Sequence, residues 1–363
     1  MMCIRVFCLL SLFLYGMQVQ ASPGFRQIKL SDPTQETLNV AVWYPASSEG
    51  RAVNTGSNAA FVGVTVNPDA PPLPGVHPLL VISHGYNGNW RNLSWLAAAM
   101  AAEGYIVAAP DHPGTTTFDQ NPIEAKKLWR RPRDISRTID FILASPALFG
   151  AADKERIAAL GHSLGGWTVM SLAGARFNPS LFIHDCQNHS KRGDCRLTEK
   201  LGITETLSLE KISANNRDAR IRAVVSLDSG LAPGFTPQSL NAINIPVLIL
   251  AAQADSVAEL PAGQESGYLA AKMNPDWRQY EVVEGATHFS FMQLCKPGAE
   301  NLLNEESPGD EIVCQDGPHA KRSTIHQNLV RKISAFLNSS LDYAASSGGT
   351  KSVKRQKRAE IHD

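Results

Sequence analysis

The pentapeptide Gly161-His162-Ser163-Leu164-Gly165 constrains the fold of this chain more than any other segment. Residues 156–160 before it are short and apolar enough for a buried strand, and residues 166–173 after it predict a helix. A serine on a sharp strand-to-helix turn has a strained backbone and an exposed hydroxyl. The positions two before and two after it must be very small, and both are glycine. The pattern predicts that Ser163 is a nucleophile; a chance match on a glycine-rich turn is the alternative.

Strands and helices alternate along most of the chain. An antiparallel pair is expected at residues 25–30 and 38–44, followed by a long loop over 46–78 with a short strand at 61–66. Further strands are expected at 79–83, 105–109, 156–160, 221–227, 247–251 and 279–283, and helices at 92–103, 133–144 and 324–337. This alternation predicts an α/β fold in which a mostly parallel sheet carries helices on both faces.

Residues 176–220 break the alternation. The segment is polar, contains two cysteines and has only a modest helical pattern near residues 207–212. Insertions at the carboxyl ends of strands overhang the site, so we interpret this one as a disulfide-pinned cap. A solvated surface excursion without a catalytic role is the alternative. One domain over residues 22–345 and a disordered basic tail over 346–363 complete the predicted organisation.

The first residues predict a secretory signal peptide. A short basic start precedes an apolar core over residues 6–15 that is too short to span a bilayer comfortably. Val19 and Ala21 are small residues at positions −3 and −1 of a cleavage site. We therefore expect export to the periplasm or the medium after cleavage behind Ala21, with an uncleaved anchor as the alternative. No later segment is long and apolar enough to cross a membrane.

Export changes the interpretation of the cysteines. Four remain after cleavage, an even number in an oxidising compartment, and short loops favour the pairs Cys186–Cys195 and Cys295–Cys314. A zinc cluster of His184, Cys186, His189 and Cys195 is the less favoured alternative, because no C-x-x-C pair is present. With 34 basic and 34 acidic residues, the charge balance gives no indication of a nucleic-acid partner.

A serine hydroxyl needs a base, which in a strand-turn-helix serine enzyme follows near the C-terminus. His288 lies in the loop behind the predicted strand 279–283, whereas His319 lies in a Pro/Gly turn and His326 in a helical pattern. The histidine needs a carboxylate, and two aspartates, Asp255 and Asp228, lie at strand ends. We favour Asp255 over Asp228.

An oxyanion site needs two backbone donors. The N–H of Leu164, directly after the nucleophile, is one candidate. The loop 84–88 supplies the other, for which we favour the N–H of Tyr86, because the glycines of this loop allow the backbone to approach a substrate. His84 is expected to brace this loop, and His162 to pack inside the turn.

These residues resemble the α/β-hydrolase superfamily, and within it the dienelactone-hydrolase-like and platelet-activating-factor-acetylhydrolase-like branch. The likeness runs from about Val40 to the last helix. It rests on residues 41–45, the run Ser83-His84-Gly85, residues 104–109, the run 161–166 and residues 285–289.

The resemblance leaves the acid open. Dienelactone hydrolases proper use cysteine as the nucleophile, so lactone specificity does not transfer to a chain with Ser163. The acetylhydrolases place the acid after the earlier strand, which favours Asp228. Residues 252–258 instead resemble the usual acid loop of the superfamily and of secreted polyester hydrolases, which favours Asp255.

We expect an exported serine hydrolase that cleaves carboxylic esters, small or lipid-like, through an acyl-enzyme. No metal, organic cofactor or nucleic acid is required, and a monomer is expected. A peptidase, thioesterase or acyltransferase on the same residues is the first alternative, and a non-catalytic binding module of this fold is the second.

Overall fold

The computed structural model describes residues 22–32, 35–47, 50–254 and 260–347. Its ten strands form one sheet in the order β10-β9-β8-β7-β5-β6-β2-β1-β4-β3. Neighbours from β5 to β10 are parallel, whereas β2 pairs antiparallel with β1 and with β6. The mostly parallel sheet and its antiparallel opening pair are therefore confirmed. The strands are β1 (Gly24–Asp32), β2 (Gln35–Tyr44), β3 (Val53–Thr55), β4 (Val64–Pro68), β5 (Val76–Ser83), β6 (Ile106–Pro110), β7 (Ala151–His162), β8 (Ile221–Leu227), β9 (Val247–Ala252) and β10 (Arg278–Val283).

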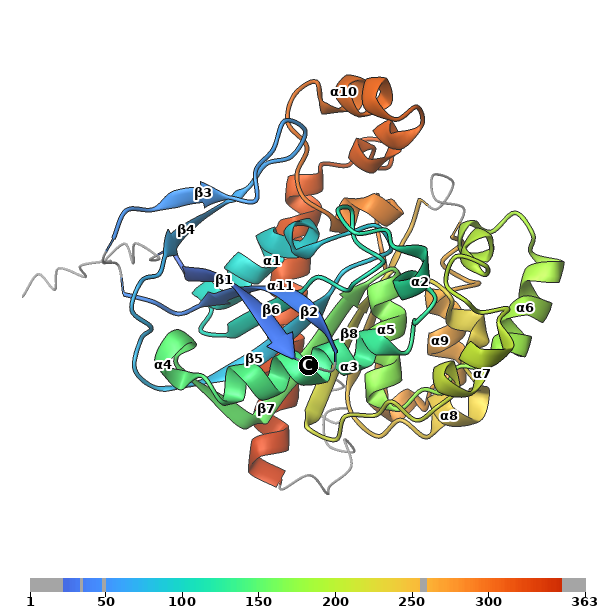
Figure 1. Ribbon diagram of the computed structural model, residues 1–363, viewed down its shortest axis with the longest axis horizontal. Coiled ribbons are helices and arrows are strands. Elements are labelled where there is room, and N and C mark those ends of the chain that lie inside the picture. The colour runs from blue at the N-terminus through green and yellow to red at the C-terminus, as the bar shows by residue number, and fades with distance from the viewer. Residues whose placement is uncertain (1–21, 33–34, 48–49, 255–259, 348–363) are drawn as a thin grey trace, which may run out of the picture.

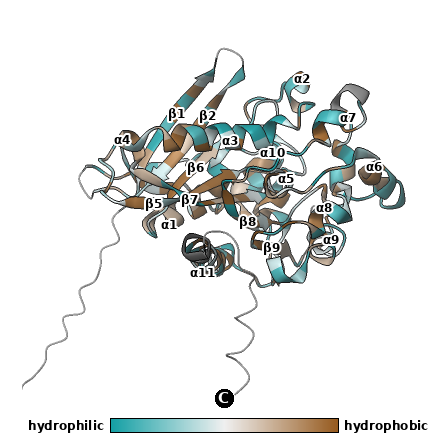
Figure 2. Cartoon of the chain, turned by 90° about the horizontal axis from the view of Figure 1, so that it is seen from below, coloured by the Kyte–Doolittle hydropathy of each residue, from teal (hydrophilic) through white to brown (hydrophobic). Residues whose placement is uncertain are grey.

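Helices cover both faces of this sheet (Figure 1). They are α1 (Ser94–Ala102), α2 (Pro122–Ala125), α3 (Arg130–Leu143), α4 (Pro146–Phe149), α5 (Leu164–Ala173), α6 (Pro179–Asn188), α7 (Thr206–Ile212), α8 (Pro237–Asn241), α9 (Ser266–Lys272), α10 (Ala299–Glu306) and α11 (Arg322–Ser347). Figure 2 shows α1 and α11 on one side of the sheet and α3 and α5 on the other. The three-layer arrangement expected from the alternation is confirmed.

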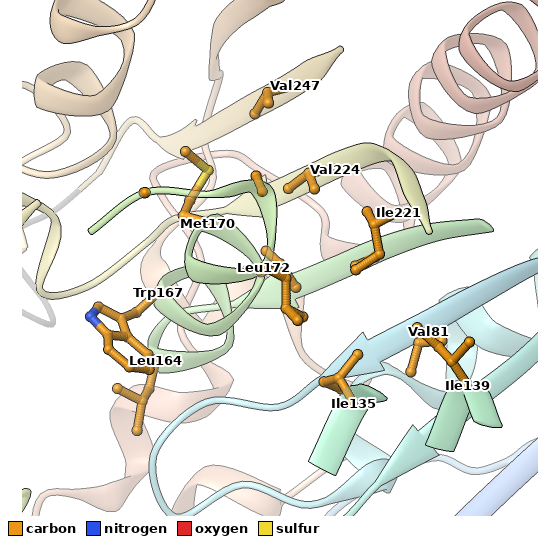
Figure 3. Packing of buried hydrophobic residues seen from close by; sticks show 14 of the residues in the cluster. Val81, Ile135, Ile139, Leu164, Trp167, Met170, Leu172, Ile221, Val224 and Val247 are labelled. Carbon is orange, nitrogen blue, oxygen red and sulfur yellow. The ribbon is translucent and has the colours of Figure 1, made fainter. Parts of the chain in front are cut away.

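Each face of the sheet has its own apolar core. The core under α3 and α5 includes Ile135 and Ile139, which lie beside Val81 of β5, and the fully buried Trp167, which lies beside Leu164 (Figure 3). The core under α1 and α11 includes Leu96 and Leu329. Strands buried on both faces explain why the sequence shows continuous apolar runs rather than alternation.

One helix of the insertion over residues 176–220 was not predicted. Helix α6 buries only Pro179 and Phe182, so its sequence lacks the apolar stripe on which the prediction depended. Its start is set locally, because the Asn178 side chain accepts a hydrogen bond from the N–H of Ser180 and proline occupies the first turn. The weak pattern near 207–212 does form α7.

Both expected disulfides are present. Cys186 is bonded to Cys195 within the insertion, and Cys295 is bonded to Cys314 after the last strand. Among the described residues, no helix is long and apolar enough to cross a membrane. The predicted signal peptide, residues 1–21, and most of the predicted tail lie outside the described residues.

The turn between β7 and α5 is packed too tightly for any side chain at its two flanking glycines. A Cβ atom on Gly161 would lie 2.0 Å from the carbonyl oxygen of Gly165. A Cβ atom on Gly165 would lie 2.0 Å from the carbonyl oxygen of Ser83, on β5. The small residues that the sequence pattern requires are therefore needed for backbone-to-backbone contact.

We predict that Gly161→Ala destabilises the fold by about 3 kcal/mol or more, because the new methyl group meets backbone that cannot move away. Urea denaturation of the mature protein measures this change. The matched control is Gly263→Ala, whose added Cβ would have no atom within 4 Å. It should change the unfolding free energy by less than about 0.5 kcal/mol. Equal effects of the two substitutions would contradict the packing described.

Helices α1 and α11 are joined by a stacked pair of rings. The indole of Trp95 and the imidazole of His326 are parallel, with centroids 3.6 Å apart. His326 Nε2 also donates to the carbonyl of Ser290, at 3.0 Å. Burial lowers the pKa of His326 to about 4, so the imidazole is neutral near pH 7.

This burial predicts acid sensitivity. Between pH 6.5 and pH 4 the unfolded chain binds a proton at His326 that the folded chain does not, so stability falls as the pH falls. From pH 7 to pH 4 this residue accounts for a loss of about 3 kcal/mol. The loss should shrink by that amount in His326→Gln, measured by urea denaturation across pH. The exposed His184, substituted in the same way, is the control. Parallel pH profiles for wild type and His326→Gln would refute the prediction.

Candidate active site

Ser163 lies between β7 and α5 with a backbone conformation that is rare outside glycine, at φ 57° and ψ −119°. Backbone hydrogen bonds hold this conformation. The N–H of Ser163 donates to the carbonyl of Leu227 at 3.0 Å, and its own carbonyl accepts from Gly166 at 2.8 Å and from Gly230 at 3.2 Å. The strained turn is thus fixed by the end of β8 and the loop behind it, while the side chain stays partly exposed.

His288 begins a 3-10 turn, His288–Phe291, in the loop behind β10. Its Nδ1 lies 2.6 Å from Oδ2 of Asp228, and both side chains are almost fully buried. An ionised carboxylate can only accept, so Nδ1 carries the hydrogen. In the neutral ring, Nε2 is then the unprotonated nitrogen that can accept a proton from a hydroxyl.

The carboxylate of Asp228 is itself fixed at the end of β8. Its Oδ1 accepts from the N–H of Ala252 at 2.8 Å, and its own N–H donates to the carbonyl of Leu250 at 2.7 Å. Asp228 is therefore tied to β9 as well as to the histidine. Asp255, which the sequence favoured, lies outside the described residues.

His162, inside the pentapeptide, lies against His288. Its Nε2 donates to the carbonyl of His288 at 2.8 Å, and the two ring centroids are 4.7 Å apart. Burial holds the pKa of His162 well below its usual range, so the ring is neutral. The residue packs inside the turn, as expected, and also holds the backbone of His288.

The loop that follows β5, residues 84–88, passes directly over Ser163. A Cβ atom on Gly85 would lie 3.1 Å from the Cβ atom of Ser163, so the absence of a side chain there permits the close approach. Leu164 is buried at the start of α5. Within the described residues, the N–H groups of Tyr86 and Leu164 donate to no protein acceptor. Both are thus available to an oxyanion.

The competing histidines are accounted for elsewhere. His326 is buried in α11 against Trp95, and His319 lies in an exposed turn at φ 62°. Cys186 and Cys195 are bonded to each other, so they are not free to form the alternative zinc cluster. In the described part of the chain, no group of three or more histidine, cysteine, aspartate or glutamate residues could hold a metal ion.

Sequence reasoning expected His84 to brace the loop that follows β5, but it missed the rest of a buried polar cluster under that loop. It comprises Ser83, His84, His112, Arg131 and Asp134, all less than a tenth exposed. Arg131 and Asp134 lie three residues apart in α3, and the predicted helix began only at residue 133. The available signal was the spacing of Arg131 and Asp134. It places these two charged residues on the same helix face as the apolar Ile135 and Ile139, and that face points into the core.

The insertion contacts the loop that carries Asp228. Arg192, inside the Cys186–Cys195 loop, forms ion pairs with Asp194 and Glu265, each at 2.7 Å. Asp194 accepts from the N–H of Leu231 and Glu265 from that of Ala232, each at 2.8 Å. The segment interpreted as a cap is therefore bonded to the backbone just beyond Asp228.

The chain is similar to known hydrolases over much of its length. A family model described as serine aminopeptidase, S33, matches residues 75–181. The chain is 25% identical to cutinase est1 of Thermobifida alba over 261 residues, which is 71% of this chain and 68% of the relative. It is 22% identical to bis(hydroxyethyl) terephthalate hydrolase of Streptomyces coelicolor over 258 residues, 71% of this chain and 65% of the relative.

A solved structure agrees in fold. The ferulic acid esterase from Streptomyces cinnamoneus matches with a TM-score of 0.61 and 20% identity, covering 90% of this chain and 92% of that one. The order of strands, the turn at Ser163 and these likenesses together support an α/β-hydrolase fold for this chain.

Proposed function

We propose that this protein is an exported serine esterase in which Ser163, His288 and Asp228 form the catalytic triad. The observation that carries the proposal is the buried pair of His288 Nδ1 and Asp228 Oδ2, 2.6 Å apart, in loops at the same edge of the sheet as Ser163. The carboxyl ends of parallel strands are where α/β folds bind ligands. Relatives named as cutinases and as a bis(hydroxyethyl) terephthalate hydrolase support an ester as the substrate.

The roles follow from the atoms available. Ser163 Oγ attacks the ester carbonyl while His288 Nε2 takes its proton. His288 then returns the proton to the leaving alcohol, and a water molecule releases the acyl group by the same route. Asp228 keeps the ring in the tautomer that leaves Nε2 free, and stabilises the imidazolium that forms.

The N–H groups of Tyr86 and Leu164 bind the oxyanion in this proposal. Two observations support it: the tight approach of Gly85 to Ser163, and the absence of a protein acceptor for either N–H among the described residues. Charge that develops on the carbonyl oxygen is stabilised by donors that are already in place.

The proposal also covers the surroundings of the site. The insertion over 176–220 is a cap, supported by its bonds to the loop beyond Asp228. Two disulfides support export through the predicted signal peptide. Pairing of His288 with Asp228, after the earlier strand, supports the acetylhydrolase-like branch of the superfamily.

A fluorophosphonate probe tests the nucleophile. The mature protein should be labelled and should hydrolyse p-nitrophenyl esters, whereas Ser163→Ala should do neither, because the probe reacts only with an activated serine. A p-nitroanilide peptide assayed in parallel addresses the activity named in the matching family model. Labelling accompanied by turnover of the peptide alone would identify a peptidase, and absence of labelling in wild type would refute the proposal.

The acid is tested by a matched pair of substitutions. Asp228→Asn should reduce kcat by about 10⁴-fold, because the amide stabilises the wrong tautomer of His288. Asp255→Asn should retain activity within a few fold. Both proteins should first be shown to unfold at the same urea concentration as wild type. The reverse ranking of the two kcat values would assign the role to Asp255.

A further inference from the structure

Arg131 is a buried cation whose hydrogen bonds all go to neutral groups. The side chain lies in α3, and the residue is only 2% exposed. Its guanidinium donates to Thr115 Oγ1 at 2.7 Å, to Thr168 Oγ1 at 3.0 Å, to Ser83 Oγ at 3.2 Å and to the carbonyl of His84 in a shorter contact. Removing a charge from water is costly, and an apolar side chain would fill the same space without that cost. The arrangement therefore needs an explanation beyond packing.

The hydrogen bonds of Arg131 join three segments around the nucleophile. Ser83 ends β5, Thr168 lies in α5 directly behind Ser163, and Thr115 belongs to the loop that follows β6. A guanidinium presents five N–H donors in a rigid plane, whereas an ammonium is a point charge on a flexible stem. The guanidinium thus fixes the position of the His84 carbonyl relative to α5, the helix that follows Ser163.

The ring of His84 also fixes the peptide between Gly85 and Tyr86. Its Nε2 accepts from the backbone N–H of His112 at 3.0 Å, so in the neutral ring the hydrogen is on Nδ1. Nδ1 then donates to the carbonyl of Gly85 at 2.7 Å. Burial lowers the pKa of His84 to about 3, so this tautomer persists across the working pH range of an esterase.

The Gly85 carbonyl determines where the N–H of Tyr86 points. That carbonyl also accepts from the N–H of Gly88, at 3.2 Å. The C=O and N–H of one trans peptide point in opposite directions within a plane, and no described peptide bond is cis. Two donors hold the Gly85 carbonyl, so the Tyr86 N–H of the same peptide points in the opposite direction, and Gly85 itself lies beside Ser163.

We propose that Arg131 is a positioning residue for the oxyanion site, acting through the His84 carbonyl and ring to orient the N–H of Tyr86. The inference rests on the proposed esterase function and adds to it a residue that touches no substrate. Arg131 sets the direction of a donor, so its loss should weaken binding of the transition state much more than binding of the substrate.

Arg131→Lys tests this role, with the adjacent Arg130→Lys as its matched control. Lysine keeps the positive charge but cannot reach four acceptors at once. Arg130 lies next in sequence and pairs with Glu124 at 2.5 Å. For Arg131→Lys we expect kcat for p-nitrophenyl butyrate to fall by about 10²-fold, with KM changed by less than about threefold. Arg130→Lys should match wild type in both.

A second readout separates orientation of the donor from a general loss of structure. Phenylboronic acid forms a tetrahedral adduct with an active serine and places an oxygen where the oxyanion forms. Its inhibition constant should rise in Arg131→Lys by roughly the factor by which kcat/KM falls. Thr168→Val, which removes one acceptor of the guanidinium without changing its charge, should shift both quantities in the same direction by about three- to tenfold.

Three results would overturn the inference. They are wild-type kcat in folded Arg131→Lys, a fall in kcat without weaker phenylboronic acid inhibition, and wild-type values of both quantities in folded Thr168→Val. Thr168→Val decides the question if Arg131→Lys does not fold. A wild-type protein that neither hydrolyses the ester nor reacts with a fluorophosphonate would instead count against the proposed function.

Discussion

The tight turn at Ser163 couples the positions of several strands and loops. Its backbone can adopt φ 57° only because β8 accepts its N–H and because no side chain separates Gly161 from Gly165 or Gly165 from Ser83. These contacts bring β5, β7 and α5 to within backbone distance of one another. The loop behind β5 and the aspartate behind β8 are placed by the same contacts, so the parts of the site are positioned by one packing arrangement.

Much of this could be predicted from sequence because the signals are local. The residues around Ser163 specify a strand, a turn and a helix, and the apolar runs specify buried parallel strands, as β8 and β9 confirm. The disulfides were predicted from the expected export and from the short loops between Cys186 and Cys195 and between Cys295 and Cys314. In each case neighbouring residues carried the information.

The remainder depends on contacts between distant segments. Asp228 and Asp255 both follow strands, and only the path of the chain brings Oδ2 of Asp228 to Nδ1 of His288, sixty residues away in sequence. Helix α6 has no apolar stripe that the sequence could reveal, and its segment is held by the Arg192 ion pairs and by a disulfide. In the sequence, nothing distinguishes Arg131 from a surface arginine. In the structure, its four acceptors come from three other segments of the chain.

Arg131 and Arg192, two of the buried arginines, differ in the groups that surround their charge. Arg192 lies among Asp185, Asp194 and Glu265, and burial raises the pKa of Glu265 well above its usual range, so this cluster can hold a shared proton and lose its excess negative charge. Such a cluster ties two segments together, the insertion and the loop beyond Asp228. Arg131 has neutral acceptors instead, and burial lowers its pKa to about 9, which leaves it charged near pH 7. A buried charge without a hydrogen-bonded counter-ion is costly, and the proposed role of Arg131 in directing the Tyr86 N–H would explain why that cost is retained.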